Sequence, residues 1–339
     1  MPRLVLAGGS GFLGKLLARH FTSLGWNVVV LTRTASRARD VRESTHGNTH
    51  GPVKAGMRGR ISFVHWDGRT PGPWTSELEG ARAVINLAGR SVNCRYHARN
   101  RRLMMDSRVV TTRLLGRVIA GCHAPPPVWL NASTATIYRH TYGEPWDEGG
   151  EIGANPEAKD AFSIEVAGAW ERAFDESATP ATRKVKLRGA MVLGLDAEAN
   201  NVFRVLHRLA RFGLGGAMGH GRQYVSWIHE TDFCRSIEWI LGHGDITGPV
   251  NLAAPHPLTN GEMMALFRKA CGMPLGLPAA HWMLEVGAWI LRTETELIIK
   301  SRRVVPGRLL RGGFRFHFEH MADAVLDLVA RLNHRPSKP

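Results

Sequence analysis

Residues 8–14 read Gly-Gly-Ser-Gly-Phe-Leu-Gly and lie between an apolar segment and a segment with helical spacing. Pro2–Ala7 supplies the apolar residues of a first strand, and Lys15–Leu24 places its large apolar residues on one face of a helix that Gly25 ends. A glycine turn at this junction lets the backbone approach phosphates, and the helix N-terminus offers unpaired N–H groups. The sequence therefore predicts a site for the pyrophosphate of a dinucleotide.

The spacing of this turn is Gly8-x-x-Gly11-x-x-Gly14, which is one residue longer than the common Gly-x-Gly-x-x-Gly fingerprint. A glycine-rich turn alone is weak evidence, because glycine is also the usual residue wherever a chain turns sharply. The preceding strand, the following helix and the position near the N-terminus together favour a nucleotide site.

Strand-like apolar runs alternate with helical segments through residue 194. The expected further strands are Asn27–Leu31, Ile61–His65, Ala83–Leu87, Val128–Asn131 and Val185–Leu193, and the expected later helices are Leu103–Ala120 and Ile164–Phe174. This alternation is typical of a mostly parallel sheet covered on both faces. We therefore expect an α/β chain with a Rossmann-type, doubly wound sheet.

The pattern divides the chain into three expected parts. Residues 1–194 form an NADP-binding domain with a polar surface insertion at 34–60, residues 195–273 form interleaved α/β segments of a substrate region, and residues 274–339 form a C-terminal helical subdomain. The middle part is expected to contain a helix at Val202–Phe212, a flexible glycine loop at Gly213–Gly221, a strand at Val225–His229, a helix at Asp232–Leu241 and a strand at Val250–Ala253.

Arg33 follows the second expected strand directly, where dinucleotide folds face the adenosine ribose. An acid at this place binds a free 2′-hydroxyl, whereas an arginine pairs with a 2′-phosphate. The first acid after Arg33 is Asp40, so NADP(H) is favoured over NAD(H). The alternative is that Arg33 only covers the end of the sheet. The expected cofactor contacts are Gly8, Ser10, Gly11, Phe12, Leu13, Gly14, Arg33, Asp67, Leu87, Ala88 and Gly89.

Composition bounds the possible partners. The 339 residues carry a formal net charge of +15, and two basic clusters, at 90–108 and 300–315, suit phosphates or a carboxylated substrate. A solvated helix face is the alternative. Neither cluster has the interleaved aromatics of a nucleic-acid site, and no apolar run is long enough to span a membrane. The four scattered cysteines suggest a reduced, cytoplasmic protein without a structural metal. We also expect a monomer or homodimer.

Three motifs resemble the extended short-chain dehydrogenase/reductase superfamily, which includes sugar-nucleotide epimerases. They are the glycine turn, the small-residue turn Leu87–Gly89, and residues 131–138, which read Asn-Ala-Ser-Thr-Ala-Thr-Ile-Tyr. The resemblance implies that Thr134 is the catalytic hydroxyl, with Ser133 beside it. The superfamily's Tyr-x-x-x-Lys pair is missing, because Phe162 and Val166 stand where it is expected.

Further segments resemble an atypical branch of epimerase-family, NADP-dependent oxidoreductases that ends in a C-terminal domain of unknown function and lacks the Tyr/Lys pair. They are Trp170-Glu171, Arg188–Gly194, Gly213–Gly216, Gly219–Gln223, Ser226–His229, Gly248–Asn251, Val305-Pro306 and Gly313-Phe314. Relatives of this branch have been linked to cell or organelle division. This resemblance implies an unknown small carbonyl or alcohol substrate, or a regulator or scaffold that binds NADPH without turnover, or a nucleotide-sugar epimerase or dehydratase.

Histidine is the expected substitute for the missing acid. His229 lies at a strand-to-helix corner near His220, Arg222 and Gln223, so it is either a proton donor in the substrate pocket or a buried structural histidine. Asp232 is expected to cap the following helix. Core packing and a surface ion pair are expected of Trp170 and Glu171.

Overall fold

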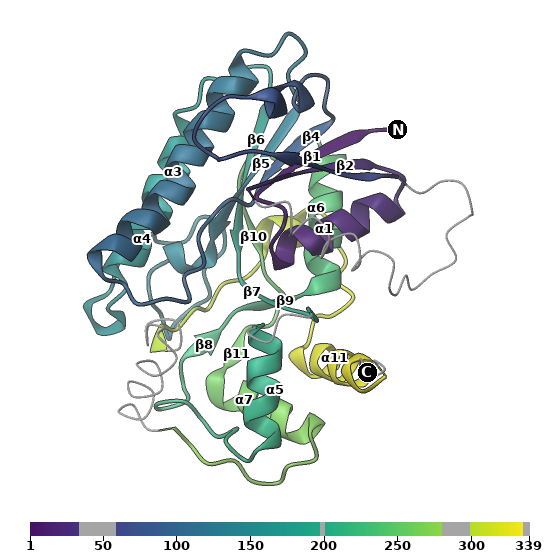
Figure 1. Cartoon of the computed structure of the whole chain (residues 1–339). Coiled ribbons are helices and arrows are strands. Elements are labelled where there is room, and N and C mark those ends of the chain that lie inside the picture. The colour runs from purple at the N-terminus through teal and green to yellow at the C-terminus, as the bar shows by residue number, and fades with distance from the viewer. Residues whose placement is uncertain (34–58, 197–200, 280–298, 335–339) are drawn as a thin grey trace.

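A seven-stranded parallel sheet, in the order β10-β6-β5-β4-β1-β2-β3, forms the centre of the molecule (Figure 1). The computed structural model describes residues 1–33, 59–196, 201–279 and 299–334. The strands of this sheet are β1 (Arg3–Ala7), β2 (Asn27–Thr32), β3 (Ile61–His65), β4 (Ala83–Asn86), β5 (Val128–Thr134), β6 (Arg183–Gly189) and β10 (Gly248–Leu252). The strand order reverses at β1, which confirms the doubly wound fold.

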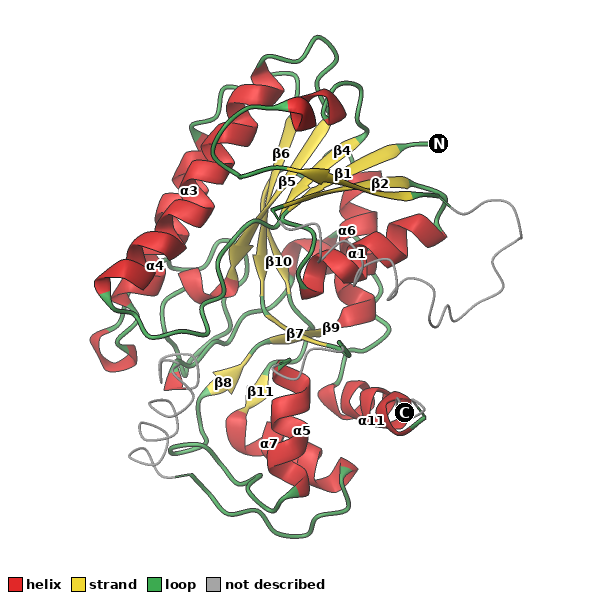
Figure 2. Cartoon of the chain, viewed as in Figure 1, coloured by secondary structure: helices red, strands yellow, loops and turns green. Residues whose placement is uncertain are grey.

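Helices cover both faces of the sheet, as Figure 2 shows. The described α-helices are α1 (Phe12–Ser23), α3 (Ala98–Ala120), α4 (Ala161–Asp175), α5 (Val202–Arg211), α6 (Glu230–Gly242), α7 (Asn260–Ala270), α10 (Gly307–Arg311) and α11 (Met321–Asn333). Short 3₁₀ turns are η1 (Pro73–Glu77), η2 (Ala135–Ile137) and η3 (Pro156–Ala158).

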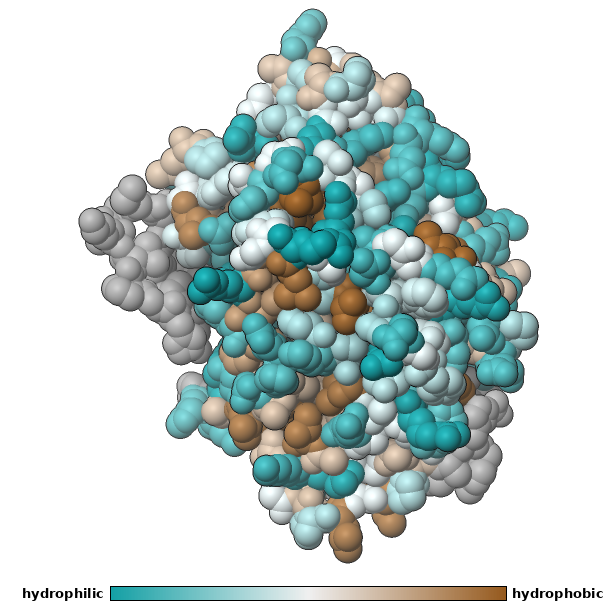
Figure 3. All heavy atoms as spheres, turned by 180° about the vertical axis from the view of Figure 1, so that it is seen from behind, coloured by the Kyte–Doolittle hydropathy of each residue, from teal (hydrophilic) through white to brown (hydrophobic). Residues whose placement is uncertain are grey.

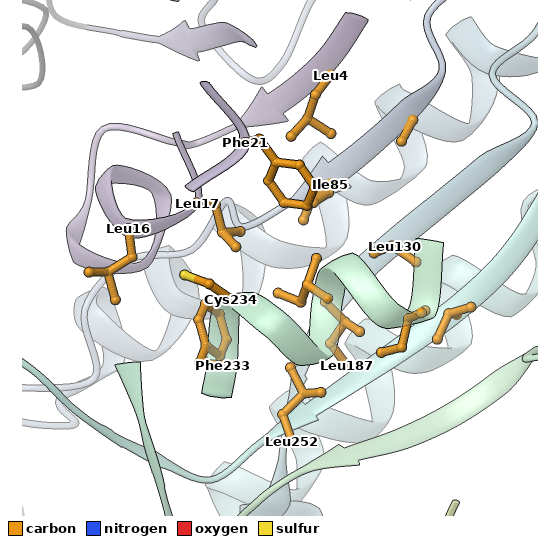
Figure 4. Packing of buried hydrophobic residues seen from close by; sticks show 14 of the residues in the cluster. Leu4, Leu16, Leu17, Phe21, Ile85, Leu130, Leu187, Phe233, Cys234 and Leu252 are labelled. Atoms are coloured by element: carbon orange, nitrogen blue, oxygen red, sulfur yellow. The ribbon is translucent and has the colours of Figure 1, made fainter. Parts of the chain in front are cut away.

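Alternation along β1 divides the core between the two faces. Leu4 and Leu6 pack with α1 and α6, whereas Val5 and Ala7 pack with α3 and α4. Figure 4 shows the first cluster, in which Phe21 of α1 lies beside residues of the sheet. Helices cover both faces at the centre of the sheet, where β1, β2 and β4 are nearly continuous hydrophobic runs.

Two predicted strands are each broken in the structure. The expected strand Val185–Leu193 is β6 followed by β7 (Met191–Leu193). Ala190 still donates its N–H to Leu252 of β10, whereas the Met191 N–H donates to the Ser226 carbonyl, so the chain changes its partner after Ala190. The expected strand Val225–His229 is β8 (Tyr224–Val225) followed by β9 (Trp227–His229). Ser226 separates these two, since its hydroxyl donates to the Arg302 carbonyl and accepts from the Val304 N–H.

The residues after β7 divide their packing between the central sheet and a second core. β10 and α6 join the main sheet and its cover, whereas α5, α7 and α11 pack around Phe203, Phe267 and Val325. Two small sheets adjoin this core, one of β7 and β9 and one of β8 and β11 (Leu258–Thr259). Nearly all of the expected 34–60 insertion, and residues 280–298 of the expected C-terminal subdomain, lie outside the described residues.

Figure 3 shows the face turned away from Figure 1, where hydrophilic residues predominate and hydrophobic ones form separate small areas. Within the described ranges, no helix combines the length and the apolar character needed to cross a bilayer.

A buried ion pair joins the C-terminal segment to the sheet domain. Lys300 Nζ lies 2.5 Å from Asp160 Oδ2 and 2.6 Å from the Thr136 carbonyl oxygen, and neither charged side chain is exposed to solvent. Asp160 Oδ1 accepts the Asn155 N–H, so the carboxylate is held from both sides. This contact fixes residue 300 against the start of α4 and the end of β5.

We expect Asp160→Asn to destabilise the protein by about 3–5 kcal/mol, because it leaves the Lys300 ammonium buried without its counter-charge. Urea unfolding followed by circular dichroism measures this loss. The double variant Asp160→Asn/Lys300→Met removes both charges and is expected to regain part of the stability. Equal stability of Asp160→Asn and the wild type would contradict the assigned contact.

Candidate functional site

The turn after β1 needs glycine at its two ends for steric reasons. Gly8 has φ +71°, and a Cβ there would lie 2.7 Å from the Ala88 Cα. A Cβ on Gly14 would lie 2.2 Å from the Gly9 carbonyl oxygen. The turn after β1 therefore packs directly against the turn after β4, and a side chain at either glycine would separate main-chain segments.

Gly11 differs from these two because a Cβ at this residue would meet no protein atom within 4 Å. Gly11 is the exposed N-cap of α1, it makes no side-chain cap, and the first turn of α1 contains no acid. Phe12, Leu13 and Gly14 begin the helix, so their N–H groups have no carbonyl partner within it. Open space, N–H donors and the positive end of a helix dipole fit the diphosphate of a dinucleotide.

A buried amide network fixes the turn after β4, which contains Leu87, Ala88 and Gly89. Asn86 accepts the Ala88 N–H through Oδ1 and donates through Nδ2 to Asn131 Oδ1 on β5, at 2.7 Å. Asn86 Nδ2 also donates to Thr112 Oγ1 of α3, which accepts the indole N–H of Trp170. The sequence did not point to Thr112, because its partners Asn86 and Trp170 lie far from it along the chain.

Arg33 and Asp67 follow neighbouring strands at the same edge of the sheet, since Thr32 pairs with His65. Arg33 is exposed. Asp67 accepts the main-chain N–H groups of Thr70 and Arg69, which lower the pKa of its carboxyl to about 2. The Asp67 side chain is therefore occupied by its own turn.

The two predicted catalytic hydroxyls have different environments. Thr134 is the last residue of β5, and its Oγ1 accepts the Thr136 N–H at 3.1 Å as the cap of η2. Ser133 is buried and donates to Glu171 Oε1 at 2.6 Å. In the bond with the Thr136 N–H, Thr134 is the acceptor, so its own hydroxyl hydrogen stays available for another partner. The Ser133 hydroxyl hydrogen is already donated to Glu171.

Glu171 and Arg188 form a buried pair behind Ser133, so the expected surface ion pair of Glu171 is wrong. Arg188 Nε and Nη2 donate to the two Glu171 oxygens, each at 2.9 Å. Burial alone raises the pKa of Glu171, but the hydrogen bonds and charge of Arg188 leave this pKa below its ordinary value. Glu171 therefore stays ionised and holds the Ser133 hydroxyl.

The same arginine continues the network toward the C-terminal segment. Arg188 Nη1 donates to the Tyr138 hydroxyl, which donates to Asn251 Oδ1 at 2.8 Å. Asn251 in turn donates from Nδ2 to the Val305 carbonyl. Burial raises the pKa of Tyr138 despite the nearby Arg188, so Tyr138 acts as a neutral hydrogen-bonding group within the core.

His229 has no exposed surface, which agrees with the second of its two expected roles, a buried structural histidine. It is fully buried as the N-cap of α6, where Nδ1 accepts the Thr231 N–H and the ring packs 3.9 Å from Phe318. Nε2 lies 3.2 Å from Asp327 of α11, and this hydrogen bond lowers the pKa of the Asp327 carboxyl. His229 therefore attaches α11 to α6.

Asp232 is not the helix cap that the sequence predicts, since His229 takes that position. The buried Asp232 carboxylate accepts the main-chain N–H groups of His317 and Phe318 instead. His220 is exposed, and its Nε2 lies 2.9 Å from the Tyr142 hydroxyl. The glycine loop that contains His220 is tied by Gly216 and Gly219 to the carbonyls of Leu277 and Ala279.

Phe162 and Val166 of α4, which stand where the Tyr/Lys pair is expected, have no proton to donate. Phe162 packs edge-on against Tyr96 and lies under the Arg101 guanidinium, and Val166 is buried. Of the catalytic groups that the superfamily resemblance implies, the hydroxyls of Ser133 and Thr134 are present, and the Tyr/Lys pair is not.

The sequence matches two family descriptions: "NAD dependent epimerase/dehydratase family" over residues 4–253 and "Domain of unknown function (DUF1731)" over residues 280–328. It is 26% identical over 327 residues to the epimerase family protein YfhF of Bacillus subtilis, covering 96% of this chain and 98% of that one. It is 27% identical over 334 residues to the epimerase family protein SDR39U1 of Bos taurus, covering 97% and 100%.

Solved structures share the fold. The crystal structure of human epimerase family protein SDR39U1 with NADPH aligns with a TM-score of 0.78 at 23% identity, covering 97% of this chain and 99% of that one. UDP-N-acetylglucosamine 4-epimerase from Bacillus cereus aligns at 0.71 and 17% identity, covering 100% and 99%. Because the epimerase/dehydratase match spans most of the sequence and begins in β1, the chain belongs to the NAD dependent epimerase/dehydratase family.

Proposed function

We propose that the protein binds NADP(H) and interconverts a small carbonyl compound and its alcohol. The open main-chain cradle at Gly11, with Arg33 at the end of β2, carries this proposal. The NADPH bound to the human relative supports it. When bound, NADP(H) supplies or accepts a hydride at C4 of its nicotinamide.

The residues proposed to hold the coenzyme follow the sheet edge. The N–H groups of Phe12, Leu13 and Gly14 would hold the diphosphate, Arg33 would pair with the 2′-phosphate, and the Leu87–Gly89 turn would border the rest of the coenzyme. Thr134 donates its free hydroxyl hydrogen to the substrate oxygen and so stabilises negative charge there. Water supplies the proton in reduction, because Ser133 is bound to Glu171 and His229 is buried elsewhere.

A second candidate is a regulator or scaffold that binds NADPH without turning it over. The absence of the Tyr/Lys pair and the structural use of His229 favour this candidate. A nucleotide-sugar epimerase or dehydratase has weaker support, because such chemistry needs an acid–base pair. We also propose a cytoplasmic location, because the four described cysteines form no disulfide. A monomer or homodimer remains our proposal for the oligomeric state.

Arg33→Gln is expected to weaken NADPH binding about 10- to 100-fold and to leave NADH binding nearly unchanged, because only NADPH has the 2′-phosphate that pairs with Arg33. Isothermal titration calorimetry measures both dissociation constants. Arg82→Gln is the matched control, since this exposed arginine precedes β4 at the opposite edge of the sheet. A wild type that binds neither coenzyme would refute the proposal.

Thr134→Val is expected to lower kcat/KM about 100- to 1,000-fold, the typical loss when one oxyanion donor is removed. Thr134→Ser keeps the hydroxyl and is expected to retain most activity. NADPH absorbance across a panel of ketones and aldehydes is the readout, and thermal unfolding checks the lost η2 cap. Tight NADPH binding with no absorbance change for any substrate would favour the regulator instead.

A further inference from the structure

The two basic clusters of the sequence serve different purposes. In the C-terminal one, Lys300 pairs with Asp160, Arg311 pairs with Asp147, and Arg308 donates to the Pro249 carbonyl. These side chains attach the C-terminal segment to the rest of the molecule. The charge of this cluster is therefore largely used inside the fold.

Three arginines of the cluster at 90–108 donate to neutral groups instead. Arg90 donates to the Asn100 side chain, Arg101 donates to the Tyr96 carbonyl, and Arg108 donates to two carbonyls. Within the described ranges, no carboxylate forms an ion pair with any of these three arginines. Arg108 is the one whose position matters for the site.

Arg108 is held rigidly beside the turn after β4. Its Nη1 and Nη2 donate to the carbonyls of Met104 and Arg90, each at 3.1 Å, and its guanidinium lies 5.1 Å from the centre of the Trp170 ring. A Cβ on Gly89 would lie 3.2 Å from the Arg108 Cζ, so glycine gives the guanidinium room against this turn.

The turn after β4 links Arg108 to the nucleotide loop. Gly89 follows Ala88, and Ala88 is the residue against which Gly8 packs. The Arg108 guanidinium therefore lies next to the main chain that borders the expected coenzyme. The Arg90 N–H donates to Ser107, so α3 fixes this turn through two successive residues.

A cation placed here needs an anion. Burial lowers the pKa of Arg108 to about 10, so it remains charged at neutral pH, and two carbonyls do not neutralise it. A partly desolvated charge without a counter-ion is costly, and an oxyanion in the guanidinium plane offsets this cost through charge-assisted hydrogen bonds.

We propose that Arg108 is an oxyanion-binding residue that takes a phosphate or carboxylate group in front of the Ala88–Gly89 turn. The anion has two possible sources, the coenzyme diphosphate or an anionic substrate. Whether the anion comes from the coenzyme or from a substrate rests on the proposed function. The binding of an oxyanion by Arg108 does not, because it can be tested with phosphate alone.

The experiment measures NADPH, NADH and inorganic phosphate binding by calorimetry on the full chain and on Arg108→Gln. If the diphosphate is the anion, this variant weakens NADPH and NADH alike, about tenfold or more, unlike Arg33→Gln, which discriminates between them. If the substrate supplies the anion, coenzyme affinity is unchanged and phosphate binding is lost. Either result supports the proposal.

Arg102→Gln is the matched control, because it removes an exposed charge from the same helix. Arg108→Lys keeps the charge but loses the planar fork, so its affinity is expected to lie between wild type and Arg108→Gln, and it replaces the glutamine variant if that unfolds. Unchanged coenzyme and phosphate affinities in the variant that folds would overturn the proposal. A wild type that binds phosphate through Arg108 but no coenzyme would refute only the proposed function.

Discussion

The contact between the turn after β1 and the turn after β4 is the constraint on which the site depends. Gly8 and Ala88 approach so closely that no side chain fits at Gly8. This approach aligns the start of α1 with the Leu87–Gly89 turn, and the Asn86–Asn131–Thr112 network holds the second turn in place. The geometry of the cradle therefore follows from packing within the sheet.

A second constraint comes from the C-terminal half of the chain. Arg188 carries the hydrogen-bond network from Ser133 through Tyr138 to Asn251, and Asn251 reaches the carbonyl of Val305. Lys300 and Arg302 both contact Thr136, just beyond Thr134. The end of β5 is thus supported by residues that lie more than 160 positions later in the sequence.

Local patterns were enough to predict six of the seven sheet strands, because glycine spacing and apolar runs lie in neighbouring residues. The seventh strand, β10, was expected in the substrate region, since nothing local shows that it pairs with β6. The expected strand Ile61–His65 agrees with β3, and the glycine turn lies where the sequence places it. The breaks at Ala190 and Ser226 were missed because the partners that end these strands are distant in sequence: the Met191 N–H donates to Ser226, and the Ser226 hydroxyl bonds residues 302–304.

The same limit applies to the candidate site. Ser133 and Thr134 were recognised from a motif, but nothing local indicates that Glu171 captures the Ser133 hydroxyl or that Thr134 caps η2. For His229 the sequence left two roles open. Its position at a strand-to-helix corner suggested chemistry, whereas Asp327, a hundred residues away, makes it part of a helix attachment.

The Lys300–Asp160 pair also limits how this chain can recombine with its relatives. The match to the epimerase/dehydratase family contains Asp160, and the match to the domain of unknown function contains Lys300. If the C-terminal region were joined to a sheet domain that lacks Asp160, the Lys300 ammonium would be buried without a counter-charge. The two regions of this chain are therefore linked through a single buried charge pair.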